Sequence, residues 1–143
     1  MTLLLLTLGA LPLAFGIVQN WYMITYMDAQ PPYKLIALSV LLLWGFIAFL
    51  FNKKGRRTKE ILISLNFVAF VDLLLLGIQE LLFHGYWMNT VGAWSQLFFL
   101  PLMNFSFTLA FWSHRVFPAY AVSFVLMLGA ALAGCKLREK MTK

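Results

Sequence analysis

Apolar residues run in long blocks along the chain, and short polar segments separate these blocks. A helix of about 17–25 apolar residues spans the hydrocarbon core of a bilayer, and several blocks reach that length. Because the polar connections are short, consecutive helices are expected to be antiparallel neighbours. The pattern predicts an all-α integral membrane protein, a five-transmembrane-helix bundle with short loops that forms a single transmembrane domain over residues 1–143. The predicted spans cover residues 3–26, 35–51, 61–84, 91–112 and 119–135.

The composition agrees with a membrane protein. Of the 143 residues, 62% are hydrophobic and 11% are charged, whereas a soluble domain is about half apolar and about a quarter charged. The net charge is +6, and the basic residues cluster in 53–59 and 136–143, beside membrane-length segments. This placement favours topological signals and attraction to anionic lipid over nucleic-acid binding. The single cysteine, Cys135, excludes an internal disulfide and a redox pair.

The third predicted span carries carboxyl groups where lipid is expected. Asp72 lies near its middle and Glu80 two turns further on. A carboxyl group inside hydrocarbon costs roughly 2.5–3.5 kcal/mol, so such groups usually face a bundle interior or a cavity. By helix geometry Asp72 shares a face with Gln79, and Glu80 lies about 80° round from it. The fourth predicted span runs back alongside and offers Gln96 and Asn104, so these five side chains form a predicted polar seam, the candidate ligand- or proton-binding site.

Two interpretations of this seam stay open. In the first, the protein binds or transports a small apolar or cationic molecule, or protons, and Asp72 takes up a proton or meets the cationic group. In the second, the carboxyls are protonated and hydrogen-bonded, and the protein is a non-catalytic accessory, assembly or immunity subunit. The expected partners are the lipid bilayer together with a small ligand, a second copy of the chain or another membrane protein, and not nucleic acid.

No catalytic, metal or cofactor motif stands out in the sequence. His84 and His114 fall at opposite ends of the third and fourth predicted spans, about 30 Å apart, which is too far for two ligands of one metal ion. HExxH, a glycine-rich phosphate loop and GxSxG are all absent from the sequence. We therefore expect no metal, no cofactor and no catalytic residue, and the sequence favours a protein that is not an enzyme.

The connection over residues 52–60 is the strongest orientation signal. Its basic residues are Lys53, Lys54, Arg56, Arg57 and Lys59. By the positive-inside rule this loop is cytoplasmic, and the chain is expected in the inner membrane of a bacterium.

With five spans, however, the basic tail 136–143 falls on the opposite side from this loop. Three explanations stay open. The tail is tolerated there, or residues 91–112, which contain Pro101, re-enter the membrane instead of crossing it. In the third, the chain inserts in both orientations and pairs as an antiparallel dimer.

In a chain of this size, Trp21-Tyr22 followed by Pro31-Pro32 resembles the tryptophan-rich sensory protein family. The basic loop and the acidic third span depart from the pattern of that family. The resemblance therefore gives no residue a role, and no family is assigned.

Overall fold

The structure, a computed structural model of the chain, describes residues 2–28, 30–52 and 58–141. Over these ranges the chain is helical and contains no strand, which confirms the all-α class. The elements are α1 (Thr2–Gly9), α2 (Leu11–Thr25), α3 (Tyr33–Phe51), α4 (Thr58–Gly77), the π-helical turn η1 (Ile78–Leu82), α5 (Thr90–Leu109) and α6 (Phe117–Met141).

In the described ranges, four helical stretches are long and apolar enough to cross a membrane. They are Thr2–Thr25, formed by α1 and α2, then Tyr33–Phe51, Thr58–Leu82, formed by α4 and η1, and Phe117–Met141. These stretches correspond to the first, second, third and fifth predicted spans. Four apolar helices of this length indicate an integral membrane protein.

The helices begin and end where the sequence interrupts the helical pattern. A turn at Ala10 separates α1 from α2, and Pro12 stands in the first turn of α2, where a missing N–H is tolerated. Pro31 and Pro32 end the connection that precedes α3. Asn89 caps α5, because its side-chain oxygen accepts a hydrogen bond of 2.8 Å from the N–H of Gly92.

Hydrogen bonds show which helix ends meet at the basic end of the molecule. The side-chain amide of Asn52, just after α3, donates to the carbonyl oxygen of Cys135 on α6 at 2.8 Å. The hydroxyl of Thr58, the first residue of α4, donates to the carboxylate of Glu139 on α6. The end of α3, the start of α4 and the end of α6 therefore lie together.

A second contact fixes the opposite end of the same helix pair. The carboxylate of Glu80 on η1 accepts a hydrogen bond of 2.7 Å from the backbone N–H of Phe117, the first residue of α6. The helix α4 with η1 and the helix α6 are therefore antiparallel neighbours over their length.

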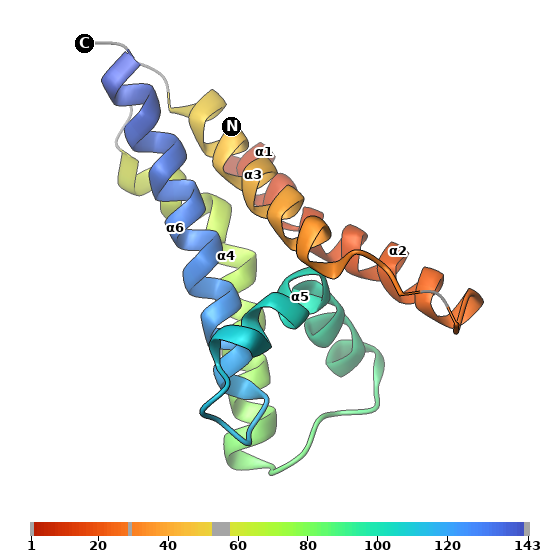
Figure 1. Cartoon of the computed structure of the whole chain (residues 1–143). Coiled ribbons are helices and arrows are strands. Elements are labelled where there is room, and N and C mark those ends of the chain that lie inside the picture. The colour runs from red at the N-terminus through yellow and green to blue at the C-terminus, as the bar shows by residue number, and fades with distance from the viewer. Residues whose placement is uncertain (1, 29, 53–57, 142–143) are drawn as a thin grey trace.

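It follows that α5 enters and leaves the bundle at one end. The chain leaves η1 beside Glu80 and returns at Phe117 beside the same carboxylate. Figure 1 shows α5 bent in the space between α2 and α3 on one side and α4 and α6 on the other, with both of its ends turned toward this end of the molecule. Pro101 lies inside α5 and removes a backbone hydrogen bond, which explains the bend.

Residues 91–112, the fourth predicted span, are not among the four membrane-length apolar stretches found in the described ranges. The segment contains groups that hydrocarbon does not solvate, since Pro101 removes a backbone hydrogen bond within α5 and Gln96 and Asn104 carry amides. The end of α6 lies at the end of the molecule that holds the start of α4.

The helices α3 and α6 pack with their backbones in contact. A Cβ atom added to Gly134 would lie 2.0 Å from the carbonyl oxygen of Gly45. Small residues permit such close approach in membrane helices. The small-residue segment 129–134 thus serves helix packing at Gly134, whereas Gly129 faces open space.

A buried aromatic cluster holds α5 against its neighbours. Phe98 and Phe99 of α5 are 1% and 0% exposed, and their ring centroids are 5.0 Å apart. Phe99 also contacts Tyr120 of α6, with ring centroids 5.8 Å apart. Burial of these rings stabilises the packing of α5 against α6.

Candidate functional site

The structure divides the predicted polar seam into two parts. Gln79, Glu80 and Gln96 gather around the connection 83–89 between η1 and α5. Asp72 and Asn104 make no hydrogen bond with this group in the described part of the chain.

Gln79 is fully buried, and both the nitrogen and the oxygen of its side-chain amide form hydrogen bonds. Its nitrogen Nε2 donates to the hydroxyl of Ser95 on α5 at 3.2 Å, and its oxygen Oε1 accepts from the backbone N–H of Trp87 at 2.9 Å. Its backbone carbonyl also accepts from the N–H of Gly85 at 3.1 Å. Gln79 therefore links η1 to α5 and to the connection between them. These hydrogen bonds agree with the second interpretation of the seam, in which its polar groups are hydrogen-bonded within the bundle.

Glu80 links three segments through one carboxylate oxygen. Its Oε2 accepts hydrogen bonds from the hydroxyl of Tyr86 and from the backbone N–H of Phe117. The first N–H groups of a helix have no partner within the helix, and the helix dipole favours a negative charge there. Glu80 thus acts as a cap for α6 supplied by a different helix.

The second oxygen of Glu80, Oε1, is buried and has no hydrogen-bond partner. The Tyr86 hydroxyl beside this carboxylate lies in the connection outside the helices. Burial, and then the hydrogen bond to Glu80, raise the pKa of Tyr86 above its ordinary value. Tyr86 therefore stays protonated and keeps donating to Glu80 at neutral pH.

Gln96 contributes a longer contact to the same connection. Its Nε2 lies 3.5 Å from the carbonyl oxygen of Trp87. Gln79 and Gln96 thus contact the N–H and the carbonyl of one residue, Trp87, from two different helices. These contacts position the start of α5.

Asp72 lies apart from these contacts, near the middle of the stretch Thr58–Leu82. It follows Leu65 and Val68 by seven and four residues and so shares their face of α4. That face packs against Gly9 of α1, where an added Cβ would be 2.8 Å from the carbonyl oxygen of Leu65. Asp72 is half-buried, and within the described residues no hydrogen bond or ion pair reaches its carboxyl group.

Asn104, the remaining member of the predicted seam, is exposed on the second half of α5. The bend at Pro101 separates the direction of this half from that of the half that carries Gln96. The sequence predicted both Gln96 and Asn104 on the fourth span as members of one seam; in the structure Gln96 contacts Trp87, and Asn104 is exposed.

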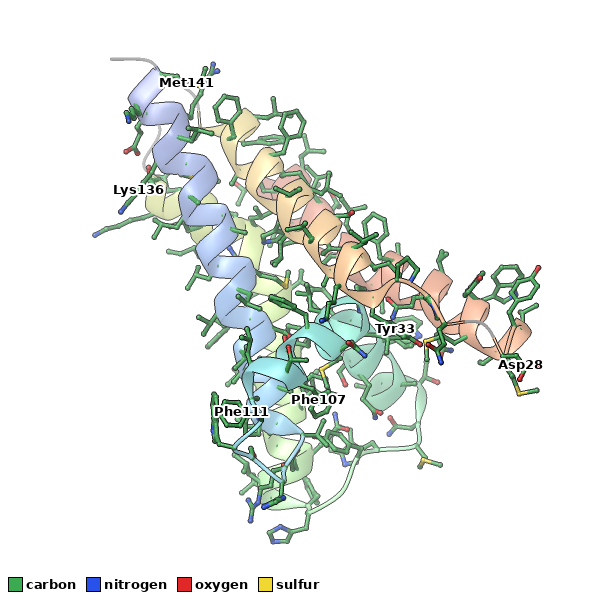
Figure 2. The ribbon with its side chains drawn as sticks, viewed as in Figure 1. Asp28, Tyr33, Phe107, Phe111, Lys136 and Met141 are labelled. Atoms are coloured by element: carbon green, nitrogen blue, oxygen red, sulfur yellow. The ribbon has the colours of Figure 1, made fainter. Side chains whose placement is uncertain are left out.

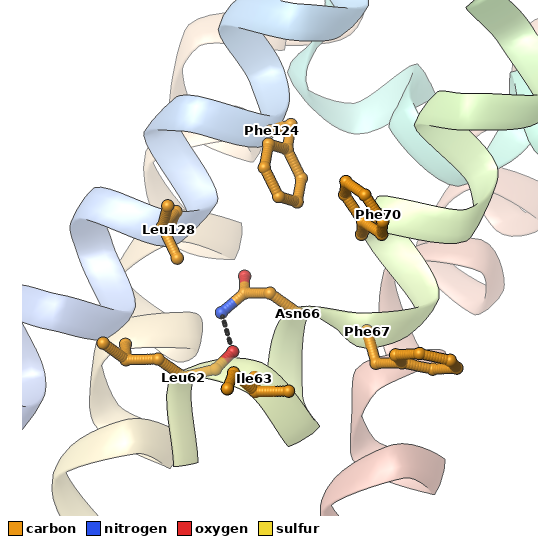
Figure 3. Close-up of a pocket in the computed structure, with 7 residues that line it drawn as sticks. All are labelled: Leu62, Ile63, Asn66, Phe67, Phe70, Phe124 and Leu128. Atoms are coloured by element: carbon orange, nitrogen blue, oxygen red, sulfur yellow. Dashed lines mark hydrogen bonds between the residues drawn. The ribbon is translucent and has the colours of Figure 1, made fainter. Parts of the chain in front are cut away.

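Asn66 is a buried polar residue of α4 that the seam did not include. Its oxygen Oδ1 accepts from the indole N–H of Trp44 on α3 at 3.0 Å, and its nitrogen donates to the carbonyl of Leu62 at 2.9 Å. Asn66 lines a hollow of about 240 Å³ between α4 and α6, and Figure 3 shows it opposite Phe124. An amide standing alone in an apolar run was the sequence signal for this residue.

The described residues contain no group of three or more His, Cys, Asp or Glu side chains that can hold a metal ion. His84 has a structural peculiarity instead, because its φ of 52° places it in the left-handed region. It follows η1 at the position where a helix commonly ends in glycine.

Comparison with models of protein families, with curated proteins and with solved structures found no match to this chain. The class comes from the fold, because four helices long and apolar enough to cross a membrane indicate a small polytopic membrane protein. A more specific function can rest only on the residues of this chain.

Proposed function

We propose that this small polytopic membrane protein binds or transports a small cationic or apolar molecule, or protons, and that Asp72 is the group that meets the cation or carries the proton. The observation that carries the proposal is the half-buried side chain of Asp72 near the middle of the stretch Thr58–Leu82, without a partner among the described residues. An acid in hydrocarbon is costly, and acids retained there mark ion or substrate pathways.

The other carboxyl group of the predicted seam, that of Glu80, already has partners, and this contrast supports the choice of Asp72. Glu80 is occupied by Tyr86 and by the N-terminus of α6, and the amide of Gln79 is occupied at both ends. These groups have structural partners that account for their presence. Asp72 has none in the described ranges, so a ligand or a proton is the remaining way to stabilise it.

The proposal includes an orientation in the inner membrane of a bacterium, with the loop 52–60 in the cytoplasm. Four crossings assign the basic tail to the same side as this loop. Of the 11 Lys and Arg residues in the sequence, Lys34 and Arg115 are the two assigned to the opposite side. This distribution follows the positive-inside rule far better than the five-span arrangement does.

Transport in proteoliposomes tests the role of Asp72. We expect wild-type protein to accumulate tetraphenylphosphonium, a lipophilic cation, in response to a pH gradient, and Asp72→Asn to abolish this uptake. The replacement is nearly isosteric but cannot ionise. Asp72→Glu, which keeps the acid, is expected to retain part of the uptake.

Asp28→Asn is the matched control, because Asp28 is an exposed acid outside the helices. It is expected to transport like wild type. The proposal fails if Asp72→Asn and wild type behave alike, both in uptake of the cation and in proton movement reported by a pH-sensitive dye inside the vesicles.

A second candidate function is that of an accessory, assembly or immunity subunit. The exposed amide of Asn104 on α5 favours it, since an amide facing hydrocarbon gains from a hydrogen bond to another helix. Purification in mild detergent separates the two functions. A subunit brings down a second membrane protein at fixed stoichiometry, and Asn104→Leu releases that protein while Asp72→Asn does not.

A further inference from the structure

The end of α2 and the start of α3 enclose a pocket that is separate from the residues discussed above. Its volume is about 350 Å³, and its walls include Phe15, Gln19 and Tyr22 of α2, Pro31 of the connection and Ile36 of α3. Aromatic rings, prolines and aliphatic side chains thus line the pocket together with two amides, Gln19 of α2 and Gln30 of the connection. This is the usual composition of a small-molecule site, mostly apolar with few polar groups.

Gln19 gives this pocket an unused hydrogen-bond acceptor. The residue is 8% exposed, and its oxygen Oε1 is buried without any hydrogen-bond partner. Buried polar groups in proteins are nearly always paired, so an unpaired one requires an explanation. A donor on a bound molecule supplies that explanation, because the side chain of Gln19 lines the pocket.

A second hollow continues the pocket along α3. It also measures about 350 Å³, and it shares Phe15 and Ile36 with the first. From there it extends past Val40 to Leu43, two turns further along α3. The two hollows together accommodate an elongated apolar chain, with the amide of Gln19 at one end.

The position of the pocket relative to the membrane follows from its neighbours. Tyr22 and Tyr26 pack with ring centroids 5.0 Å apart near the end of α2, and Trp21 is exposed beside them. Tyrosine and tryptophan concentrate at the boundary between lipid and water. In Figure 2, Asp28 at this end lies far from Met141 at the basic end. The Gln19 end therefore lies near the interface, and the hollow along α3 leads toward the membrane centre.

We propose that this groove binds an amphipathic molecule with a hydrogen-bond donor at its head and an apolar chain behind it. The donor, a hydroxyl, amide or ammonium group, binds Oε1 of Gln19, and the chain lies over Phe15 and Ile36. A free small molecule and a lipid with a donating headgroup share this chemistry. The inference does not depend on the role proposed for Asp72, because the two sites share no residue.

Photolabelling of purified protein in lipid nanodiscs tests the site. One probe is a diazirine-bearing octanol, and the other is the methyl ether of the same compound, which lacks the donor. We expect the alcohol to label pocket residues of α2 and α3 about fivefold more than the ether does, the equivalent of one ordinary hydrogen bond. This comparison uses wild-type protein and needs no variant.

Gln19→Leu is expected to reduce labelling by the alcohol to the level of the ether. Asn20→Leu is the matched control, because it removes an amide from the next residue, which is not among the residues lining the groove. The proposal is overturned if the two probes label alike in wild type, if labelling spreads over all lipid-facing helices, or if both variants behave alike.

The lipid of the nanodisc identifies the source of the donor. Phosphatidylcholine has no donor in its headgroup, whereas the ammonium of phosphatidylethanolamine donates. If phosphatidylethanolamine suppresses labelling by the alcohol, the site is a lipid site. If labelling is equal in the two lipids, the site takes a free amphipathic molecule.

Discussion

The backbone N–H of Phe117 donates a hydrogen bond to the carboxylate of Glu80 across 2.7 Å. This contact joins the end of one membrane-length helix to the start of another. The segment between them, including all of α5, therefore leaves and rejoins these two helices at one end of the bundle. The topology of the whole chain depends on this relationship.

Reporter fusions check that topology. We expect a fluorescent protein fused after Lys143 to be active and alkaline phosphatase at the same site to be inactive, because four crossings bring the tail to the side of the basic loop. A fusion within residues 84–89 should give the opposite result. Active alkaline phosphatase at the C-terminus would contradict the four-span arrangement.

Tyr86 is expected to make stability depend on alkaline pH. The ordinary pKa of its hydroxyl is 10.0, and burial and the Glu80 contact raise it in the folded protein. The folded state therefore holds this proton more tightly than the unfolded chain does. The resulting stabilisation is complete below about pH 10 and decreases as the pH rises further toward the folded-state pKa.

Tyr86→Phe is the variant that isolates this effect. It lacks the titrating proton, so its apparent melting temperature in detergent should fall less steeply above about pH 10 than that of wild type. At neutral pH it should be less stable than wild type, because Glu80 loses a donor. Parallel curves for the two proteins above pH 10 would rule out the contribution of Tyr86.

Gly134→Ala is expected to destabilise the bundle. The added Cβ would lie 2.0 Å from the carbonyl oxygen of Gly45, so α3 and α6 must move apart. Overpacking of this kind costs roughly 1–3 kcal/mol. Gly129→Ala, on the same helix but in open space, should be neutral or slightly stabilising. Thermal unfolding of both variants in detergent measures the difference, and equal melting temperatures would argue against the close packing of α3 on α6.

His84→Gly is expected to be more stable than His84→Ala. A side chain at φ 52° brings its Cβ close to the following carbonyl, which costs roughly 1–2 kcal/mol, and glycine avoids this clash. Both variants remove the imidazole, so their difference reports the backbone alone. If alanine proves as stable as glycine, His84 does not adopt the left-handed conformation.

The sequence predicted four of the helices well because long apolar runs bounded by Pro31-Pro32 and by basic residues have few alternatives in a membrane. For residues 91–112, which contain most of α5, it left a crossing and a re-entrant segment both open. A bend at Pro101 and a return of the chain to Glu80 depend on contacts between distant residues. The length and apolarity of residues 91–112 alone suggested a crossing.

The polar seam was predicted in part. Gln79 and Glu80 do bring segments together, but two of the four partners of their side chains are the backbone N–H groups of Trp87 and Phe117, which a sequence pattern does not reveal. The predicted angles between Asp72, Gln79 and Glu80 also hold only for a regular α-helix. The π-helical turn η1 changes the angle between successive residues, and both side chains lie within it.

The Glu80–Phe117 contact also has a consequence for synthesis of the chain. The two residues are 37 positions apart, so when Glu80 is added to the growing chain, the amide that its carboxylate binds does not yet exist. The connections on either side of α5 remain without this anchor until α6 begins to enter the membrane. The last helix to be made is therefore the one that completes the fold of the segment before it.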